Sequence, residues 1–192
     1  MDGALSGALW NTTGKRNKSL TFDATDDRVV VKSSANLAGQ TAGSVSAWVY
    51  PTTMDATQRG IYSEDIAGGT VLHLITVDST FVFSIRSSGA VWTDCATTTT
   101  YTTNKWYHLT ATFNSSNGDI NVYVNGKLAC TSTTWDGTFT ASVTGSLIGD
   151  YTNAGTYGFG GKIDEVKTYT SELTASQVLV NYNQGSSAVL GQ

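Results

Sequence analysis

The sequence predicts an all-β protein, a two-sheet antiparallel β-sandwich with one short C-terminal helix. Apolar and polar residues alternate through much of the chain, and this period-2 pattern is typical of strands with one buried face. Such segments recur about every ten residues, and turn residues rather than helical patterns separate them. The 192 residues include 20 glycines, and only 14% are charged, a composition poor in strong helix formers. These observations exclude a helical bundle and favour a jelly roll.

Three strands are predicted in the first half of the chain. Over residues 45–50, apolar side chains that fit a core occupy every odd position. Pro51 ends this segment because it has no N–H to donate to a sheet ladder. Residues 81–86 alternate in the same way, again with the odd positions assigned to the core. A Ser-Gly pair at 88–89 then turns the chain into a further strand over residues 90–95.

Three more strands are predicted towards the middle of the chain. Residues 107–113 place their odd positions on the core face, and residues 120–124 place their even positions there. The Asn125-Gly126 pair is the strongest hairpin signal in the sequence, because a type I′ turn needs positive φ at both central positions. We therefore expect a hairpin that joins residues 120–124 to residues 127–132.

The one predicted helix covers residues 175–183. Thr174 is its expected N-cap, and Gln177, three residues later, completes a capping box. Leu173 and Val178 have the spacing of a hydrophobic staple, which packs the residue before the cap against the first turn. These signals mark the start of the helix more clearly than any other element boundary.

The chain is expected to form one domain over residues 1–185, with Gly185 ending the helix. Residues 186–192 are small and polar and are assigned to a C-terminal linker or tail. The first residues lack the basic and apolar regions of a signal peptide, so we expect a mature or excised part of a longer chain.

Charge and hydropathy exclude two classes of partner. The formal net charge is -4 and no basic cluster is present, which argues against nucleic acid and against anionic membrane surfaces. No apolar run approaches the roughly 18 residues that a membrane-spanning helix needs, so no membrane insertion is expected. We expect the isolated domain to be a monomer.

Two cysteines, Cys95 and Cys130, stand in separate strand-like stretches. They are too few for a disulfide scaffold, and no zinc-ligand spacing accompanies them. A single bridge between neighbouring strands and two separate reduced thiols both remain open.

Four parts of the chain, taken in order, resemble one family. They are residues 19–31 (SLTFDATDDRVVV), 45–51 (VSAWVYP), 105–113 with 120–128 (KWYHLTATF and INVYVNGKL), and the last part, 146–149 (SLIG), 159–166 (FGGKIDEV) and 175–182. This pattern resembles the laminin G-like, or concanavalin A-like, jelly-roll domains of bacterial and archaeal secreted proteins, over roughly residues 8–183. Two departures stand out: Ala24 replaces the family's usual glycine, and the segment before residue 10 is short.

The resemblance implies a structural calcium ion at the rim of the sandwich, Ca²⁺ being the one cofactor expected. The matching positions are Asp23, Asp26, Asp27 and Asp164, which would tie the opening Asp turn to the IDEV strand. Calcium takes six to eight oxygen ligands, and short carboxylates beside backbone carbonyls supply them. The alternative is that Asp26 and Asp27 are solvated turn residues and that Asp164 accepts hydrogen bonds from the backbone.

Aromatic side chains are the candidate ligand contacts, because Trp and Tyr rings stack on the C–H faces of sugars while their N–H or O–H groups reach polar partners. The candidate ligand-binding residues are Trp48, Trp92, Trp106, His108, Trp135, Tyr151, Tyr157 and Arg86. Trp48, Trp106 and His108 lie opposite the core faces of their strands, where burial under neighbouring loops is the alternative. The other aromatic residues stand in loop-like stretches and are expected to be exposed.

Catalysis has less support. The ExDxxE pattern of the related glucanases is absent, and Glu64 and Asp65, as neighbours on a strand, point to opposite faces and cannot flank one bond. His73 and His108 are the two histidines, and no G-x-S-x-G elbow is present. Enzymatic activity is left open, with a non-catalytic role favoured.

The function that these features favour is a non-catalytic carbohydrate-binding or adhesion module of a secreted or cell-surface protein, stabilised by calcium. Its expected partner is a glycan or polysaccharide, with a surface protein as a second kind of partner. One alternative is a small hydrolase or lyase that uses His73 or His108 with an acidic residue or a tyrosine. Another is a purely structural surface module, since this architecture hosts many unrelated roles.

Overall fold

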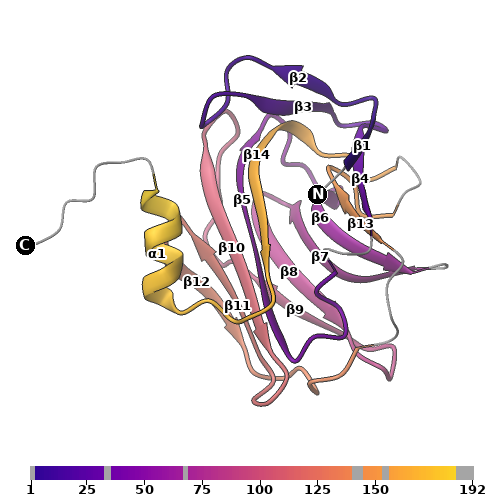
Figure 1. The fold of residues 1–192 in the computed structure, drawn as a ribbon, viewed down its shortest axis with the longest axis vertical. Helices are drawn as coiled ribbons and strands as arrows, with labels where there is room; N and C mark the ends of the chain where they lie inside the picture. Colours follow the sequence, from indigo (N-terminus) through magenta and orange to yellow (C-terminus); the bar gives the residue numbers. More distant parts are fainter. Residues whose placement is uncertain (1–2, 33–35, 67–68, 140–144, 153–155, 185–192) are drawn as a thin grey trace, which may run out of the picture.

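The computed structural model describes residues 3–32, 36–66, 69–139, 145–152 and 156–184. Two antiparallel sheets of seven strands face each other, and one helix follows the last strand, so the predicted sandwich is confirmed (Figure 1). We call the sheet with the order β1-β4-β13-β6-β7-β8-β9 sheet A, and the sheet with the order β12-β11-β10-β5-β14-β3-β2 sheet B.

The strands of each sheet come from distant parts of the chain. Those of sheet A are β1 (Gly3–Ser6), β4 (Arg28–Lys32), β13 (Gly145–Ile148), β6 (Arg59–Ile66), β7 (Gly69–Val77), β8 (Thr80–Arg86) and β9 (Trp92–Ala96). Those of sheet B are β12 (Lys127–Ser132), β11 (Asp119–Val124), β10 (Tyr107–Asn114), β5 (Ala42–Pro51), β14 (Gly160–Tyr169), β3 (Ser19–Asp23) and β2 (Leu9–Asn11).

The core lies between the two sheets and is built from the inner faces of their strands. Val45, Ala47 and Val49 of β5 are 0% exposed, and the odd-numbered residues of β8 and β10 are also buried, as the alternation predicts. Burial of apolar surface is the main favourable term in folding, so this layer holds the sheets together.

The predicted hairpin joins β11 to β12. Asn125 (φ 51°) and Gly126 (φ 77°) both have the positive φ that a type I′ turn needs, and Val124 pairs with Lys127 across the turn. The side-chain oxygen of Asn125 also accepts a hydrogen bond from the backbone N–H of His108, at 2.9 Å. The turn is therefore tied to β10 as well as to its own two strands.

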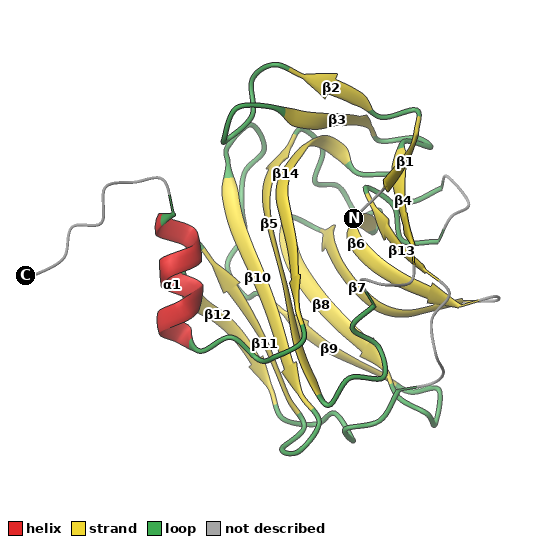
Figure 2. Ribbon diagram, in the orientation of Figure 1, coloured by secondary structure: helices red, strands yellow, loops and turns green. Residues whose placement is uncertain are grey.

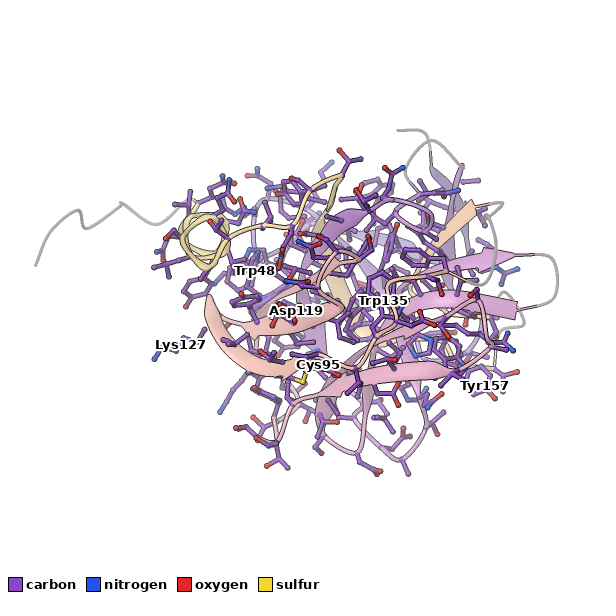
Figure 3. The ribbon with its side chains drawn as sticks, turned by 90° about the horizontal axis from the view of Figure 1, so that it is seen from below. Trp48, Cys95, Asp119, Lys127, Trp135 and Tyr157 are labelled. Carbon is purple, nitrogen blue, oxygen red and sulfur yellow. A yellow bond between two sulfur atoms is a disulfide. The ribbon has the colours of Figure 1, made fainter. Side chains whose placement is uncertain are left out.

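A disulfide joins Cys95 of β9 to Cys130 of β12, with a sulfur–sulfur distance of 2.03 Å. These strands are the outermost ones of sheets A and B on the same side of the sandwich. The bridge, whose Cys95 end is labelled in Figure 3, links the two sheets at that edge. The sequence left open a disulfide bridge and two separate thiols, and the structure shows the bridge.

The helix α1 spans Ala175–Asn183 and lies on the outer face of sheet B (Figure 2). Its capping box is present: the Thr174 hydroxyl accepts the N–H of Gln177 at 3.3 Å, and the Gln177 side chain accepts the N–H of Thr174 at 2.9 Å. Leu173 and Val178, the predicted staple pair, are buried against Tyr123 of β11.

Gly185 and the predicted tail at 186–192 lie outside the described residues. Within the described part of the chain, no helix is long and apolar enough to cross a membrane.

Candidate functional site: a groove on sheet A

The outer face of sheet A carries a groove of about 520 Å³ that runs over β7, β8 and β9. A volume of this size is typical of sites for small molecules. Its lining residues are Gln58, His73, Ile75, Val77, Asp78, Thr80, Val82, Ser84, Trp92, Asp94, Ala96 and Tyr151. The groove lies on the opposite side of the sandwich from α1, which covers sheet B.

Aromatic rings form one end of the groove. The His73 ring stacks on Trp92 with centroids 4.8 Å apart and planes at 27°, and it contacts Tyr151 at 5.1 Å on another side. Tyr151 in turn packs against Tyr157, with centroids 4.5 Å apart. His73 is 7% exposed and Trp92 is 39% exposed, so the indole is the most accessible ring of the stack. His73 is the ring that contacts the indole directly, and Tyr151 packs on His73.

The strand register explains the rest of the groove. Ser84 of β8 pairs with His73 on one side and with Asp94 on the other. The next row towards the β7–β8 hairpin is the apolar set Ile75, Val82 and Ala96, which forms the floor. An apolar floor beside a polar row suits a ligand with one apolar face and polar edges.

Polar groups stand around this floor. The Tyr151 hydroxyl donates to the Gln58 side-chain oxygen at 2.7 Å, so the amide nitrogen of Gln58 is left to donate elsewhere. Asp78 and Asp94 are exposed, and their carboxylates make no hydrogen bond within the described part of the chain. Both carboxylates can accept hydrogen bonds from hydroxyl groups of a ligand.

His73 is neutral at physiological pH. Burial lowers its pKa to about 4, and the nearby carboxylate of Asp94 offsets only part of this effect. Its Nδ1 is buried and finds no hydrogen-bond partner among the described residues. The imidazole therefore contributes an uncharged ring to the aromatic end.

Four of the predicted ligand-binding residues lie at or beside the groove. Trp92 and Tyr151 line it, although Tyr151 is only 9% exposed, so the expectation that it is exposed is wrong; Tyr157 packs against Tyr151. Arg86 pairs with Trp92 across β8 and β9 but does not itself line the groove. Sequence position alone could not show that Trp92 and Tyr151 both contact His73, because more than fifty residues separate them and the order of strands in sheet A brings them to one groove.

Trp48 and His108 lie on the other sheet. Trp48 pairs with His108 across β5 and β10, and their rings are 5.1 Å apart. Tyr182 of α1 packs on both, at 5.6 Å from Trp48 and 6.0 Å from His108, and the Lys15 ammonium sits 4.4 Å from the Trp48 ring. Trp48 and His108 are therefore both buried, and the helix α1 covers them. Trp106, half-buried, packs against Tyr50 on sheet B as well.

The expectation that Trp135 is exposed is wrong. Trp135 is 3% exposed, and its ring packs edge-on against Phe113 and Phe139 inside the core. Its indole N–H donates to the carbonyl of Thr138 at 2.9 Å, which satisfies the one polar group of the side chain. The polar residues around it in the sequence suggested a surface loop, but a nearby backbone acceptor lets the loop turn its ring inwards. Figure 3 shows Trp135 away from Trp48 and from Tyr157.

Several residues of the groove were not predicted as ligand contacts. Alternation does place Val82 and Ser84 opposite the core face of β8, so an outward orientation could be read from the sequence. His73 was considered only as a catalytic residue. No local signal marks Gln58 or Ile75, because they reach the groove through strand pairing and through the loop that carries Tyr151.

Three of the four predicted calcium ligands lie together. Side-chain oxygens of Asp23, Asp26 and Asp27 lie within 4.8 Å of one another in the turn between β3 and β4. Burial raises the pKa of Asp27, and the neighbouring carboxylate of Asp23 raises it further, because like charges oppose ionisation. A cation between these groups would relieve that repulsion. Ca–O distances of about 2.3–2.6 Å place two ligands of one ion at most about 5 Å apart, so the spacing fits calcium.

Asp164 lies outside this acidic group. Its Oδ2 accepts the backbone N–H of Arg16 at 2.8 Å, and it pairs with Trp48 in the register of β14 and β5. Burial raises the pKa of Asp164. Asp164 thus agrees with the alternative to calcium binding, in which its carboxylate accepts a hydrogen bond from the backbone.

His73, one of the two histidines considered for catalysis, is not part of a catalytic triad with its strand neighbours. Ser84 stands between His73 and Asp94 in the sheet, and no hydrogen bond joins these three side chains in the described part of the chain. Glu64 is 0% exposed and accepts the N–H groups of Leu37 and Ala38, so its carboxylate anchors a loop.

The comparisons with solved structures agree with this architecture. The binding domain of Paraclostridial Mosquitocidal Protein 1 matches with a TM-score of 0.77 and 15% identity, over 95% of this chain and 47% of that chain. The botulinum neurotoxin serotype D ligand-binding domain in complex with N-acetylneuraminic acid matches with a TM-score of 0.76 and 17% identity, over 96% and 46%. This chain thus spans about half the length of these two proteins.

A third structure covers more of its own length. Domain 4 of AbnA, a GH43 extracellular arabinanase from Geobacillus stearothermophilus, in complex with arabinotriose, has a TM-score of 0.71 and 23% identity, over 91% of this chain and 81% of that chain. At these identities the likeness concerns the fold alone. A search of curated protein sequences found no significant match. The family model of the concanavalin A-like lectin/glucanases superfamily, Laminin_G_3, matches residues 23–179, and the chain therefore belongs to this superfamily.

Proposed function

We propose that this protein is a non-catalytic carbohydrate-binding module and that the groove on sheet A is its binding site. The observation that carries the proposal is the ring stack of His73, Trp92 and Tyr151, which leaves Trp92 39% exposed beside unpaired carboxylates. A sugar ring has apolar C–H faces and a polar rim of hydroxyls. Aromatic rings together with a few polar groups complement this pattern.

The comparisons support a binding role for this architecture. Domain 4 of AbnA was solved with arabinotriose, and the neurotoxin domain was solved with N-acetylneuraminic acid. These ligands belong to those proteins, and their relevance to this chain is part of the proposal. A glycan or polysaccharide is thus the proposed partner.

The experiment is a glycan array, followed by calorimetric titration of the saccharides that bind. We expect Trp92→Ala to weaken binding about five- to tenfold, since stacking on one aromatic ring contributes about 1–1.5 kcal/mol. Trp10→Ala is the matched control, because Trp10 is 67% exposed and lies on β2 of the other sheet. Equal loss in both variants, or binding that survives Trp92→Ala, would exclude this groove as the site.

We also propose that calcium binds at Asp23, Asp26 and Asp27 and stabilises the turn between β3 and β4. The side chain of Asp26 makes no hydrogen bond within the described residues, so Asp26→Asn should alter the fold little when metal is absent. With calcium, the melting temperature of the native protein should rise because an ion that binds only the folded state stabilises it.

The calcium test compares melting temperatures in calcium and in chelator. Asp26→Asn should lose the response to calcium, and Asp119→Asn, an acidic site on sheet B, should keep it. A native protein whose melting temperature is the same in both buffers would refute the calcium proposal.

Location outside the cell, or on its surface, is proposed as well. The Cys95–Cys130 bridge supports it, because disulfides persist in oxidising compartments and are rare in the cytosol. A free-thiol assay on protein isolated from its source organism under alkylating conditions tests it. Two alkylated cysteines in that protein would contradict the proposal.

A further inference from the structure

We infer that the groove on sheet A selects uncharged saccharides and discriminates against those that carry carboxylate or sulfate groups. This inference rests on the proposed function and adds the chemical class of the ligand. It comes from the charges that line the groove and from the positions that they occupy along its strands.

The two charged residues in the lining are both acidic. Asp94 stands in the row of His73 and Ser84, and Asp78 stands at the β7–β8 hairpin, just beyond Val77. At about 3.3 Å per residue, His73 and Val77, the last residue of β7, are about 13 Å apart along the strand, and Asp78 follows in the turn. The carboxylates therefore bracket the apolar floor, and a ligand on that floor lies between two negative charges.

No positive charge in the lining offsets them. Among the described residues, neither lysine nor arginine lines the groove. His73 does not supply a charge either, because burial lowers its pKa to about 4. Arg86 pairs with the lining residue Trp92 but does not itself line the groove; it is half-buried and already has an interaction partner. Sites for carboxylates and phosphates are typically built around arginine, whose fork of N–H groups pairs with two oxygens.

The remaining polar groups fit hydroxyls. Asp78 and Asp94 can each accept hydrogen bonds from sugar O–H groups, and the amide nitrogen of Gln58 can donate one. The floor of Ile75, Val82 and Ala96 is apolar, so it can contact the C–H face of a sugar ring without burying a polar group. A carboxylate on the ligand would find no cationic partner in the lining and would repel both aspartates.

The experiment uses matched pairs of saccharides: each uronate- or sialate-containing oligosaccharide and the same molecule with its carboxyl groups reduced to alcohols. Affinities of the intact protein are measured by calorimetric titration. We expect the reduced member to bind at least about tenfold more tightly, the order of magnitude for repulsion by two nearby carboxylates at intermediate dielectric. Raising the salt concentration should narrow this gap, because salt screens the repulsion.

The variant is the double substitution Asp78→Asn/Asp94→Asn, and the readout is the ratio of the two affinities. A lost hydrogen bond weakens both members of a pair, whereas lost repulsion favours only the acidic member, so the ratio should fall severalfold. Asp119→Asn, on sheet B, is the control and should leave the ratio unchanged.

Two failures can be told apart. If acidic members bind as tightly as their reduced counterparts, and Trp92→Ala abolishes that binding, the groove binds glycans but the charge selectivity is wrong. If no saccharide of either kind binds, the proposed function fails, and this inference fails with it.

Discussion

The outer faces of the two sheets carry the same three kinds of ring but differ in what lies above them. On sheet A, His73 stacks with Trp92 and contacts Tyr151. On sheet B, His108 contacts Trp48 and Tyr182. Tyr182 belongs to α1, which covers its face, whereas sheet A keeps an open groove. Trp48 is accordingly 5% exposed and Trp92 is 39% exposed.

The charges around the two ring sets are also opposite. Burial lowers the pKa of both histidines to about 4, but Asp94 is the charged neighbour of His73, whereas Lys167 and Arg16 lie near His108. The same residue types thus serve two purposes. On sheet B they attach a helix to the sandwich, and on sheet A they leave one ring accessible to solvent.

The largest expected difference between the faces is in stability. Trp48→Ala should lower the free energy of unfolding by about 3–5 kcal/mol, because it removes a large side chain from beneath α1. Trp92→Ala should lower it by about 1 kcal/mol or less, since the indole is already partly solvated. Urea denaturation of both variants measures this. Similar losses would mean that the two ring sets have the same structural role.

The disulfide connects the two sheets at the edge nearest the groove. Replacing Cys95 and Cys130 together with alanine should cost about 2–4 kcal/mol, because the bridge restricts the unfolded chain. Saccharide affinity should change much less, since β9 keeps its ladder with β8 and therefore holds Trp92 in place. Thermal unfolding and calorimetric titration of the same variant separate the two effects. Affinity that collapses while the fold persists would show that the bridge positions the groove.

The histidines predict a dependence of stability on pH. Each has a folded-state pKa of about 4, below the ordinary value of about 6.5 for an unfolded chain. Between these pH values the unfolded chain binds more protons than the folded one. Their contribution is therefore complete above about pH 6.5 and declines as the pH falls towards 4, by up to about 1.4 kcal/mol per pH unit for each histidine.

Glutamine substitutions test this pH dependence on each face separately. In urea denaturation between pH 7 and pH 4, His73→Gln and His108→Gln should each decline less steeply than the native protein. Parallel curves for the native protein and both variants would contradict the assignment of neutral, buried imidazoles.

The smallest expected effect is at Ala24, which lies on neither face. Its φ is 69°, in the left-handed region that costs a residue with a Cβ roughly 1–2 kcal/mol. Ala24→Gly should therefore raise the free energy of unfolding by up to about 1 kcal/mol, since the greater freedom of glycine in the unfolded chain offsets part of the gain. The melting temperature should rise, and saccharide binding should not change. A lower melting temperature would show that the Ala24 methyl group contributes packing that outweighs the strain.

Much of the fold could be predicted because its signals are local. The alternation in β5, β8 and β10 depends on each residue and its neighbours two positions away. The Asn125-Gly126 turn and the capping box of Thr174 are short motifs whose backbone requirements can be read from the residue types. Each of these predictions is confirmed.

The candidate site could be predicted only in part. Alternation shows which side of a strand a residue occupies, but it does not show whether another element covers that side. Trp48 and Trp92 both point away from the core, and α1 buries only the first. Trp135 shows the converse error: it stands in a polar stretch of sequence and is expected to be exposed, but its ring is buried in the core. Its indole N–H donates a hydrogen bond to the carbonyl of Thr138, so burial leaves no polar group unsatisfied.

The sequence by itself determined the class of fold, the positions of six of the strands, the hairpin, the start of the helix and the acidic turn at Asp23, Asp26 and Asp27. Tertiary structure alone decided that Cys95 meets Cys130, that His73 meets Trp92 and Tyr151, and that Asp164 lies away from the acidic turn. The physical reason is the distance along the chain over which each determinant acts. Backbone preferences and alternation act over a few residues, whereas the groove depends on strand order in sheet A and on which outer face α1 covers.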